Sequence, residues 1–190
     1  MHGGVGEEPD GEVLEFTVKS SHKKLFARVR TGNPIMRIHV SYAGTTVEGE
    51  GEEEDTVVPP IEGDLEFQLF RDVAPITANF IAGFAQAGFY DDQIFHRIIK
   101  DFVVQGGDPA GTGSGDVGFN FDHEFRPELI FTGRGQLAMA NSNGGYNRGN
   151  PFGSGFISLG NSKATNGSQF FVTVKQPRHL DFRHTIFGQM

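Results

Sequence analysis

The sequence of 190 residues contains no cysteine, no tryptophan and no apolar run long enough to span a membrane. The absence of cysteine excludes disulfides, a thiol nucleophile and cysteine-based metal sites. Residues 1–11 are polar and lack the apolar centre of a signal peptide, so neither a membrane span nor a leader is expected. Acidic residues outnumber basic ones by 24 to 16, which speaks against binding to nucleic acid. Phenylalanine is abundant, with 19 residues, and predicts an aromatic core.

An acidic stretch divides the chain. Six acids lie within residues 48–55 and two prolines follow shortly after, which predicts an exposed linker over residues 48–60. Residues 1–47 form a β-rich N-terminal segment, in which period-two alternation predicts three strands, over residues 13–18, 24–30 and 36–42. Three strands are too few for a separate sandwich, so this segment either docks on the main domain or belongs to a partial immunoglobulin-like module.

The remaining residues, 61–190, predict a main domain that is mostly β. Residues 65–70 alternate as a strand, and a helix is expected over about residues 74–87, with Asp72 as its N-cap and Gly88 at its end. The apolar stripe of this helix consists of Ile76, Phe80, Ile81 and Phe84. The rest of the chain predicts glycine-punctuated antiparallel strands, and the expected fold is a closed antiparallel β-barrel with one capping helix.

The candidate chemistry lies in three separated segments, residues 95–114, 165–173 and 180–188. The first segment holds Arg97 among apolar side chains and ends in a glycine-rich turn. Strand periodicity puts Val103 and Gln105 on one face of a strand, and Gln169 and Phe171 on one face of another. Each strand would therefore bring one apolar wall and one amide to a shared pocket.

The three segments, in this order, closely resemble the cyclophilins, and the resemblance covers residues 63–190. It implies a cyclophilin-like barrel and the activity of a peptidyl-prolyl cis-trans isomerase that assists protein folding. Its partners would be proline-containing peptides or unfolded chains. The family continues into a second helix and a final strand, so we expect the chain to stop at Met190 short of these elements.

Such an isomerase has modest chemical needs. A prolyl amide crosses between cis and trans over a barrier of about 18–20 kcal/mol, because rotation breaks the resonance of the C–N bond. The catalyst needs an apolar slot for the ring, donors for the neighbouring backbone, and one strong donor that favours the deconjugated nitrogen. Arg97 suits the last role, since a guanidinium is always charged and donates in a fixed plane.

By resemblance, Arg97 is the catalytic arginine, Gln105 orients it, and Phe102 completes the catalytic group. The residues implied to bind the substrate, by lining the proline pocket or contacting the peptide backbone, are Val103, Ala140, Asn141, Gln169, Phe171, His179, Leu180 and His184. Gly113 belongs to the glycine-rich turn, which we expect at the rim of the peptide site. Considered alone, Phe102 or Phe171 could equally be a core residue. Only the occurrence of all three segments in this order favours a binding site.

The sequence departs from the family pattern at two places near the site. His179 stands where many cyclophilins carry a tryptophan that helps to bind cyclosporin-type inhibitors, so reduced affinity for these inhibitors is expected. Residues 142–164 form an insertion where the family has a short turn. The insertion contains no Asp or Glu, and we expect it to act on peptide selection and not on the chemical step.

Other motifs carry less weight. Residues 113–118 match a dinucleotide fingerprint, but no helical pattern follows them. His179 and His184, with Asp181 between them, show no further ligand, so neither a metal nor a cofactor is expected.

Two functional classes remain open. The first is an active proline isomerase, and the second is a non-catalytic proline-peptide binding or surface-adhesion module on the same scaffold. The N-terminal segment resembles those that precede cyclophilin domains in exported bacterial proteins, which favours an exported or cell-surface location.

Overall fold

The computed structural model describes residues 14–18, 23–29, 34–48, 56–142 and 165–190. Its strands are β1 (Leu14–Val18), β2 (Lys23–Val29), β3 (Ile35–Tyr42), β4 (Thr45–Val47), β5 (Thr56–Val58), β6 (Ile61–Leu69), β7 (Arg97–Ile99), β8 (Val103–Gly106), β9 (Gln136–Met139), β10 (Phe170–Thr173) and β11 (Ile186–Gln189). The helices are α1 (Pro75–Gln86) and the short 3₁₀ helix η1 (Arg178–Leu180).

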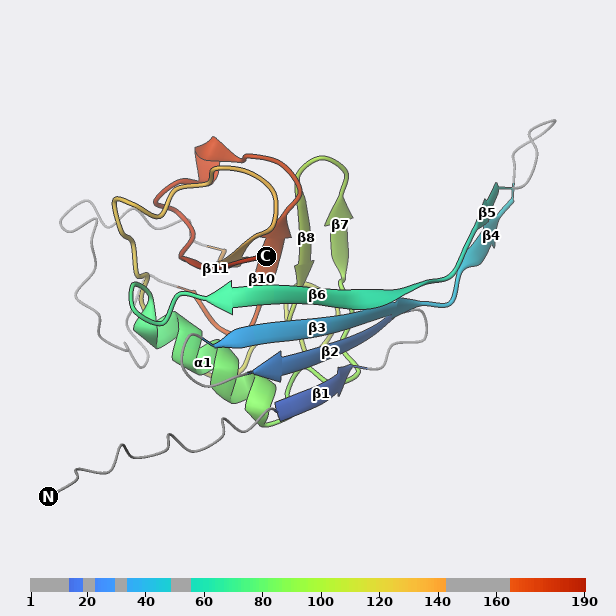
Figure 1. Cartoon of the computed structure of the whole chain (residues 1–190), viewed down its shortest axis with the longest axis horizontal. Coiled ribbons are helices and arrows are strands. Elements are labelled where there is room, and N and C mark those ends of the chain that lie inside the picture. The colour runs from blue at the N-terminus through green and yellow to red at the C-terminus, as the bar shows by residue number, and fades with distance from the viewer. Residues whose placement is uncertain (1–13, 19–22, 30–33, 49–55, 143–164) are drawn as a thin grey trace, which may run out of the picture.

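Nine strands form one antiparallel sheet in the order β1-β2-β3-β6-β11-β9-β10-β8-β7. The sheet curls into a half-barrel, and α1 packs against β1 and β2 and also contacts β11 (Figure 1). Among the described strands, β1 and β7 are the two edges. The mainly β fold with one α-helix is as predicted from the sequence.

The N-terminal strands continue the main sheet. The strands expected before residue 47 form close to their predicted bounds, and β3 pairs with β6 from Ile35 opposite Gln68 to Tyr42 opposite Ile61. Alternation along β3 buries Met36 against the core, at 1% exposure. Of the two alternatives for this segment, the pairing favours docking on the main domain.

The predicted linker contains a strand. Residues 56–58 form β5, which pairs with β4 in a separate two-stranded ribbon that projects from the β3–β6 hairpin (Figure 1). The turn into the ribbon requires Gly44, because φ there is +83° and a Cβ would lie 2.8 Å from the carbonyl oxygen of Val58. As expected, the described part of this stretch supplies no strand to the main sheet, and residues 49–55 of the acidic stretch lie outside the described residues.

Helix α1 ends as the sequence predicts but begins differently. Pro75 occupies its first position, and Gly88, at φ +70°, follows its last turn. The prediction of Asp72 as N-cap is wrong, because the N-cap position is Ala74 and its side chain makes no capping bond. A distant buried carboxylate caps the helix instead: Glu124 accepts hydrogen bonds from the backbone N–H groups of Ile76 (3.1 Å) and Thr77 (2.7 Å).

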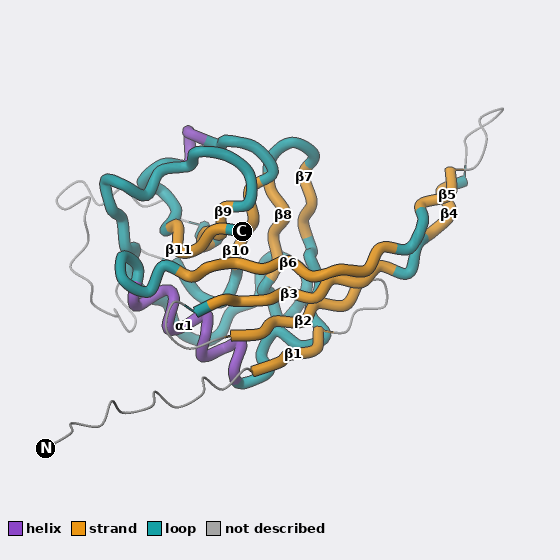
Figure 2. Tube along the Cα trace, viewed as in Figure 1, coloured by secondary structure: helices purple, strands orange, loops and turns teal. Residues whose placement is uncertain are grey.

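The core consists of two clusters. One lies between α1 and the sheet and is rich in aromatic rings, such as Phe80 stacked on Phe121 with centroids 4.9 Å apart. The other includes Val103, Phe131 and Phe171, and lies beneath the candidate site. Much of the described chain outside the sheet and α1 consists of loops and turns (Figure 2), and residues 107–135 are an irregular connection where the sequence analysis expected strands.

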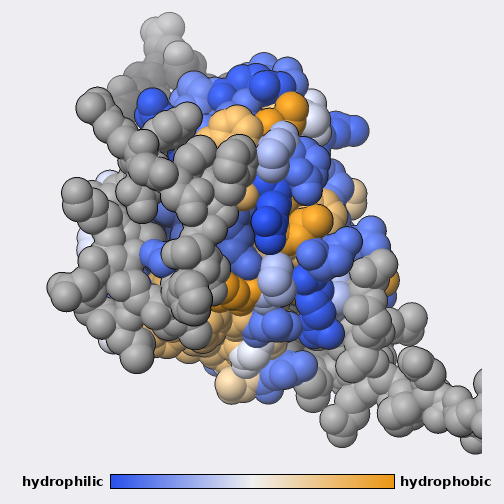
Figure 3. Space-filling model, turned by 90° about the vertical axis from the view of Figure 1, so that its left-hand side faces the viewer, coloured by the Kyte–Doolittle hydropathy of each residue, from blue (hydrophilic) through white to orange (hydrophobic). Residues whose placement is uncertain are grey.

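The described residues show no sign of a membrane-spanning helix or a metal site. On the face turned to the viewer in Figure 3, hydrophobic side chains form small areas between hydrophilic ones. Within the described ranges, no helix is long and apolar enough to cross a membrane. The same residues contain no group of three or more His, Asp or Glu side chains arranged to hold a metal ion.

Candidate active site

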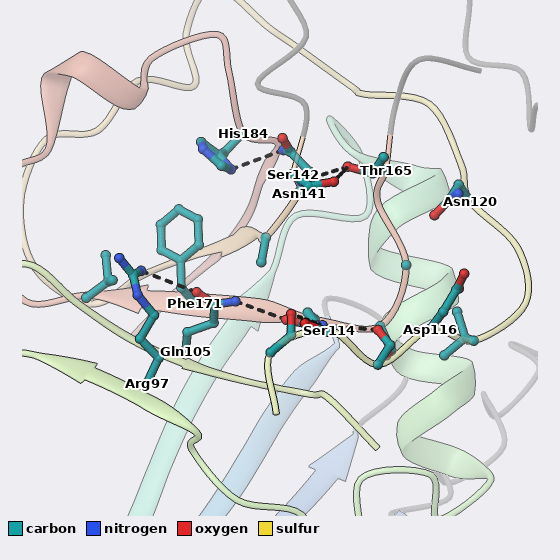
Figure 4. Close-up of a pocket in the computed structure, with 18 of the residues that line it drawn as sticks. Arg97, Gln105, Ser114, Asp116, Asn120, Asn141, Ser142, Thr165, Phe171 and His184 are labelled. Carbon is teal, nitrogen blue, oxygen red and sulfur yellow. Dashed lines mark hydrogen bonds between the residues drawn. The ribbon is translucent and has the colours of Figure 1, made fainter. Parts of the chain in front are cut away.

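Three neighbouring strands bring together residues that are far apart in the sequence. In the register of β7 with β8, Arg97 lies opposite Gln105, and in that of β8 with β10, Gln105 lies opposite Phe171. Because cross-strand partners point to the same face of a sheet, the three side chains form one row (Figure 4). The row places an exposed guanidinium beside a buried aromatic ring.

Hydrogen bonds extend this row into a chain of amides. Arg97 Nη1 donates to Gln105 Oε1 at 3.4 Å, and Gln105 Nε2 donates to Gln169 Oε1 at 3.0 Å. Gln169 Nε2 in turn lies 3.2 Å from the carbonyl oxygens of both Gly113 and Gly115. The predicted partner of Arg97, Gln105, is therefore in contact with it.

An apolar slot adjoins the guanidinium. Val103 and Phe171 are 2% and 4% exposed and belong to the same buried cluster, against which Phe102 and Leu180 pack. The edge of the His184 ring meets Phe171, with centroids 5.2 Å apart and an interplanar angle of 82°. These five side chains offer a surface suited to a small apolar ring.

His184 presents a neutral ring to this slot. Burial lowers its pKa, although a hydrogen bond to the carbonyl oxygen of Met139 (2.9 Å from Nδ1) works in the opposite direction. Since a carbonyl only accepts, Nδ1 carries the proton. Asn141 Nδ2 lies 3.1 Å from this Nδ1, which cannot accept while it carries the proton, and donates instead to the carbonyl oxygen of Arg183 at 3.1 Å.

The slot and the amide chain line one pocket of about 660 Å³. All the site residues predicted from the sequence line it except His179. His179 is exposed, and its ring stacks on that of Phe102 with centroids 5.5 Å apart. The lining residues that the sequence analysis did not assign are Ser114, Gly115, Asp116, Val117, Asn120, Ser142, Thr165, Gly167 and Ser168. Several of these belong to the glycine-rich turn expected at the rim, which could have pointed to them.

Comparison with known proteins decides the family. The family model described as "Cyclophilin type peptidyl-prolyl cis-trans isomerase/CLD" matches residues 55–190. The chain belongs to the cyclophilin family. It is an enzyme of the peptidyl-prolyl cis-trans isomerase class, and the function predicted from the sequence is confirmed at this level.

Individual relatives agree with this assignment. Peptidyl-prolyl cis-trans isomerase A of Mycobacterium tuberculosis is 41% identical over 143 residues, covering 67% of this chain and 68% of the relative. Peptidyl-prolyl cis-trans isomerase-like 1 of Homo sapiens is 43% identical over 131 residues, with the same coverage. A crystal structure of a Cryptosporidium parvum cyclophilin in the presence of the dipeptide Ala-Pro has a TM-score of 0.54 and 38% identity, covering 67% of this chain and 72% of that one.

Proposed function

We propose that this cyclophilin isomerises Xaa-Pro bonds of peptides and unfolded proteins in the pocket described above. Phe102, Val103, Phe171 and Leu180 would hold the pyrrolidine ring, and Arg97 would donate to the prolyl nitrogen as it loses conjugation. One observation carries the proposal: a guanidinium that is exposed to substrate borders a buried apolar slot and is held there by Gln105.

The energetics of the reaction fit these groups. Lowering the barrier by about 6–7 kcal/mol would accelerate isomerisation by about five factors of ten. A positioned charge acts strongly on a nitrogen whose lone pair appears only in the twisted state. Arg97 makes a long contact of 3.4 Å with Gln105 through Nη1 alone, so other guanidinium donors remain available for a substrate.

The other predicted residues would hold the peptide. Ala140, Asn141 and Gln169 border the slot along the pocket wall and would contact the backbone on either side of the proline. A neutral His184 would complete the apolar surface without placing a charge beside the apolar pyrrolidine ring. Gly113, beyond Gln169, would form the rim.

Replacing Arg97 tests the proposal. Arg97→Ala is expected to lower kcat/KM on a short Ala-Pro peptide by about 10²–10³, as for loss of one transition-state donor. Arg37 lies on β3, outside the pocket lining, and pairs with Glu66 of β6. Arg37→Ala is therefore expected to leave the rate unchanged. If Arg97→Ala keeps the wild-type rate while the protein stays folded, the assigned mechanism is wrong.

Measurements on the wild-type protein distinguish the isomerase from the non-catalytic alternative. A wild-type protein that binds the Ala-Pro peptide, but whose isomerisation rate equals the uncatalysed one, would favour the binding or adhesion module.

Further features remain proposals. Cyclosporin-type inhibitors would bind with reduced affinity because His179, a smaller ring than tryptophan, covers Phe102, and His179→Trp should tighten their binding. The net charge of −8 supports the absence of nucleic-acid binding. Closure of the half-barrel stays a prediction. So does the division of the chain into residues 1–47, 48–60 and 61–190. The pairing of β3 with β6 supports docking of the N-terminal segment on the main domain.

A further inference from the structure

A buried carboxylate organises the glycine-rich wall of the pocket from behind. Asp108 follows β8, is 1% exposed and accepts backbone hydrogen bonds from Ala110 (2.9 Å), Thr112 (2.9 Å), Gly113 (2.5 Å) and Gly115 (3.2 Å). Burial alone would raise its pKa, but these four bonds together lower it below the usual value. The carboxylate is therefore ionised at neutral pH.

The loop wraps tightly around this side chain. A Cβ at Gly115 would lie 1.7 Å from Asp108 Oδ1, so only glycine allows the backbone so close. The same glycine residues that donate their N–H groups to Asp108 turn their carbonyl groups to Gln169. Asp108 thus determines where two acceptors in the pocket wall lie.

These acceptors fix the orientation of both glutamine amides. Backbone carbonyls only accept, so Gln169 must turn its NH₂ to the loop and its Oε1 to Gln105. Gln105 must then turn its NH₂ to Gln169, which leaves Oε1 to face the guanidinium of Arg97. If Gln105 were reversed, its NH₂ would face a cation.

We propose that Asp108 is a positioning residue for the isomerase reaction, acting on Arg97 through Gly113, Gly115, Gln169 and Gln105. The inference rests on the proposed function of Arg97. Asp108 lies outside the pocket lining and would not touch the substrate. Its effect would be to hold the guanidinium in the one orientation that an acceptor at Gln105 permits.

A double-mutant cycle tests this coupling. Asp108→Asn keeps the size of the side chain but turns an NH₂ group toward backbone donors, and should lower kcat/KM by about tenfold. In an Arg97→Ala background the same change should have less than a twofold effect, because the residue through which it acts is gone. Equal losses in both backgrounds would overturn the proposal, since a merely structural residue acts independently of Arg97. Asp64→Asn, an equal charge change on the exposed part of β6, should leave the rate unchanged.

A second measurement covers the case in which Asp108→Asn folds poorly. Gln169→Glu breaks the chain of amides beyond the Asp108 loop, because a carboxylate cannot donate to the Gly113 and Gly115 carbonyls. It should lower kcat when Arg97 is present and leave kcat nearly unchanged in the Arg97→Ala background, while loss of the direct contact between Gln169 and the peptide raises KM in both backgrounds. Comparable losses of kcat in the two backgrounds would count against the relay.

A spectroscopic readout separates failure of the relay from failure of the proposed function. The side-chain NH₂ signals of Gln105 and Gln169 and the Nε–H signal of Arg97 should shift in Asp108→Asn and stay in place in Asp64→Asn. They do so whether or not the wild type is active, so an inactive wild type rejects only the proposed function. Unchanged NMR signals in Asp108→Asn would reject the relay.

Discussion

The carboxylate of Glu124 should contribute more to stability than any single surface ion pair of this protein. It is 6% exposed and accepts from three donors of the first turn of α1: the N–H of Ile76 at 3.1 Å, and the N–H and Oγ1 of Thr77, each at 2.7 Å. The site also lies at the positive end of the helix dipole. Glu124→Ala leaves these donors without their acceptor in a buried place.

The magnitude follows from the count of donors. Each buried donor left unsatisfied costs about 1–3 kcal/mol, and partial access of water to the helix end reduces the sum to about 3–5 kcal/mol. For a chain of this size about 2–4 °C of melting temperature is lost per kcal/mol, so a decrease of about 10 °C is expected. Thr77→Val removes one donor together with its need for a partner, and should lower stability by only about 1 kcal/mol.

Thermal unfolding followed by circular dichroism measures the effect. Glu128→Ala is the matched control, because Glu128 is exposed in the same irregular connection and its loss should change the melting temperature by less than about 2 °C. Isomerase activity at low temperature should survive in all three variants, since Glu124 does not line the pocket. If Glu124→Ala and Glu128→Ala melt together, solvent satisfies the helix end and the capping argument is refuted.

Two further perturbations should change stability in opposite directions. Burial, with a smaller effect of nearby His184, lowers the pKa of His123 to about 4. In the unfolded chain this histidine binds its proton near pH 6.5. The unfolded state therefore gains a proton first, and about 2–3 kcal/mol of stability should be lost as the pH falls from 6.5 to 4. His123→Asn, which can still accept from Asn166, should flatten this decrease in a series of melting curves, and equal slopes would contradict it. Gly83→Ala fills open space in the interior of α1 and should raise stability by about 0.5–1 kcal/mol in urea unfolding; a decrease would mean that the site is not open.

Period-two alternation in the sequence was enough to predict β1, β2, β3 and the second half of β6, but not the irregular connection over residues 107–135. Alternation gave β3 because Met36 and Ile38 face the core while Arg37 faces outward, and this periodicity depends only on the pleat. The predicted site residues that line the pocket were chosen because the segments around Arg97 and Phe171 resemble those of the cyclophilins. His179 was the exception, since its ring stacks on the pocket wall from outside and does not line the pocket.

The failed predictions share one physical cause, which is that side chains distant in the sequence replace local backbone partners. Asp72 looked like a helix cap by position alone, but a carboxylate 47 residues beyond Thr77 takes that role. Residues 107–135 lack regular strands because their N–H groups find side-chain acceptors: Asp108 near the start, and Asp181, which accepts from the N–H of Phe131 at 2.7 Å, near the end. A buried backbone group needs a partner but not a strand, and a sequence pattern reports strands only. Irregular connections in this cyclophilin are therefore held by a few buried acids, so that a single carboxylate, Asp108, can affect both the loop and the arginine beyond it.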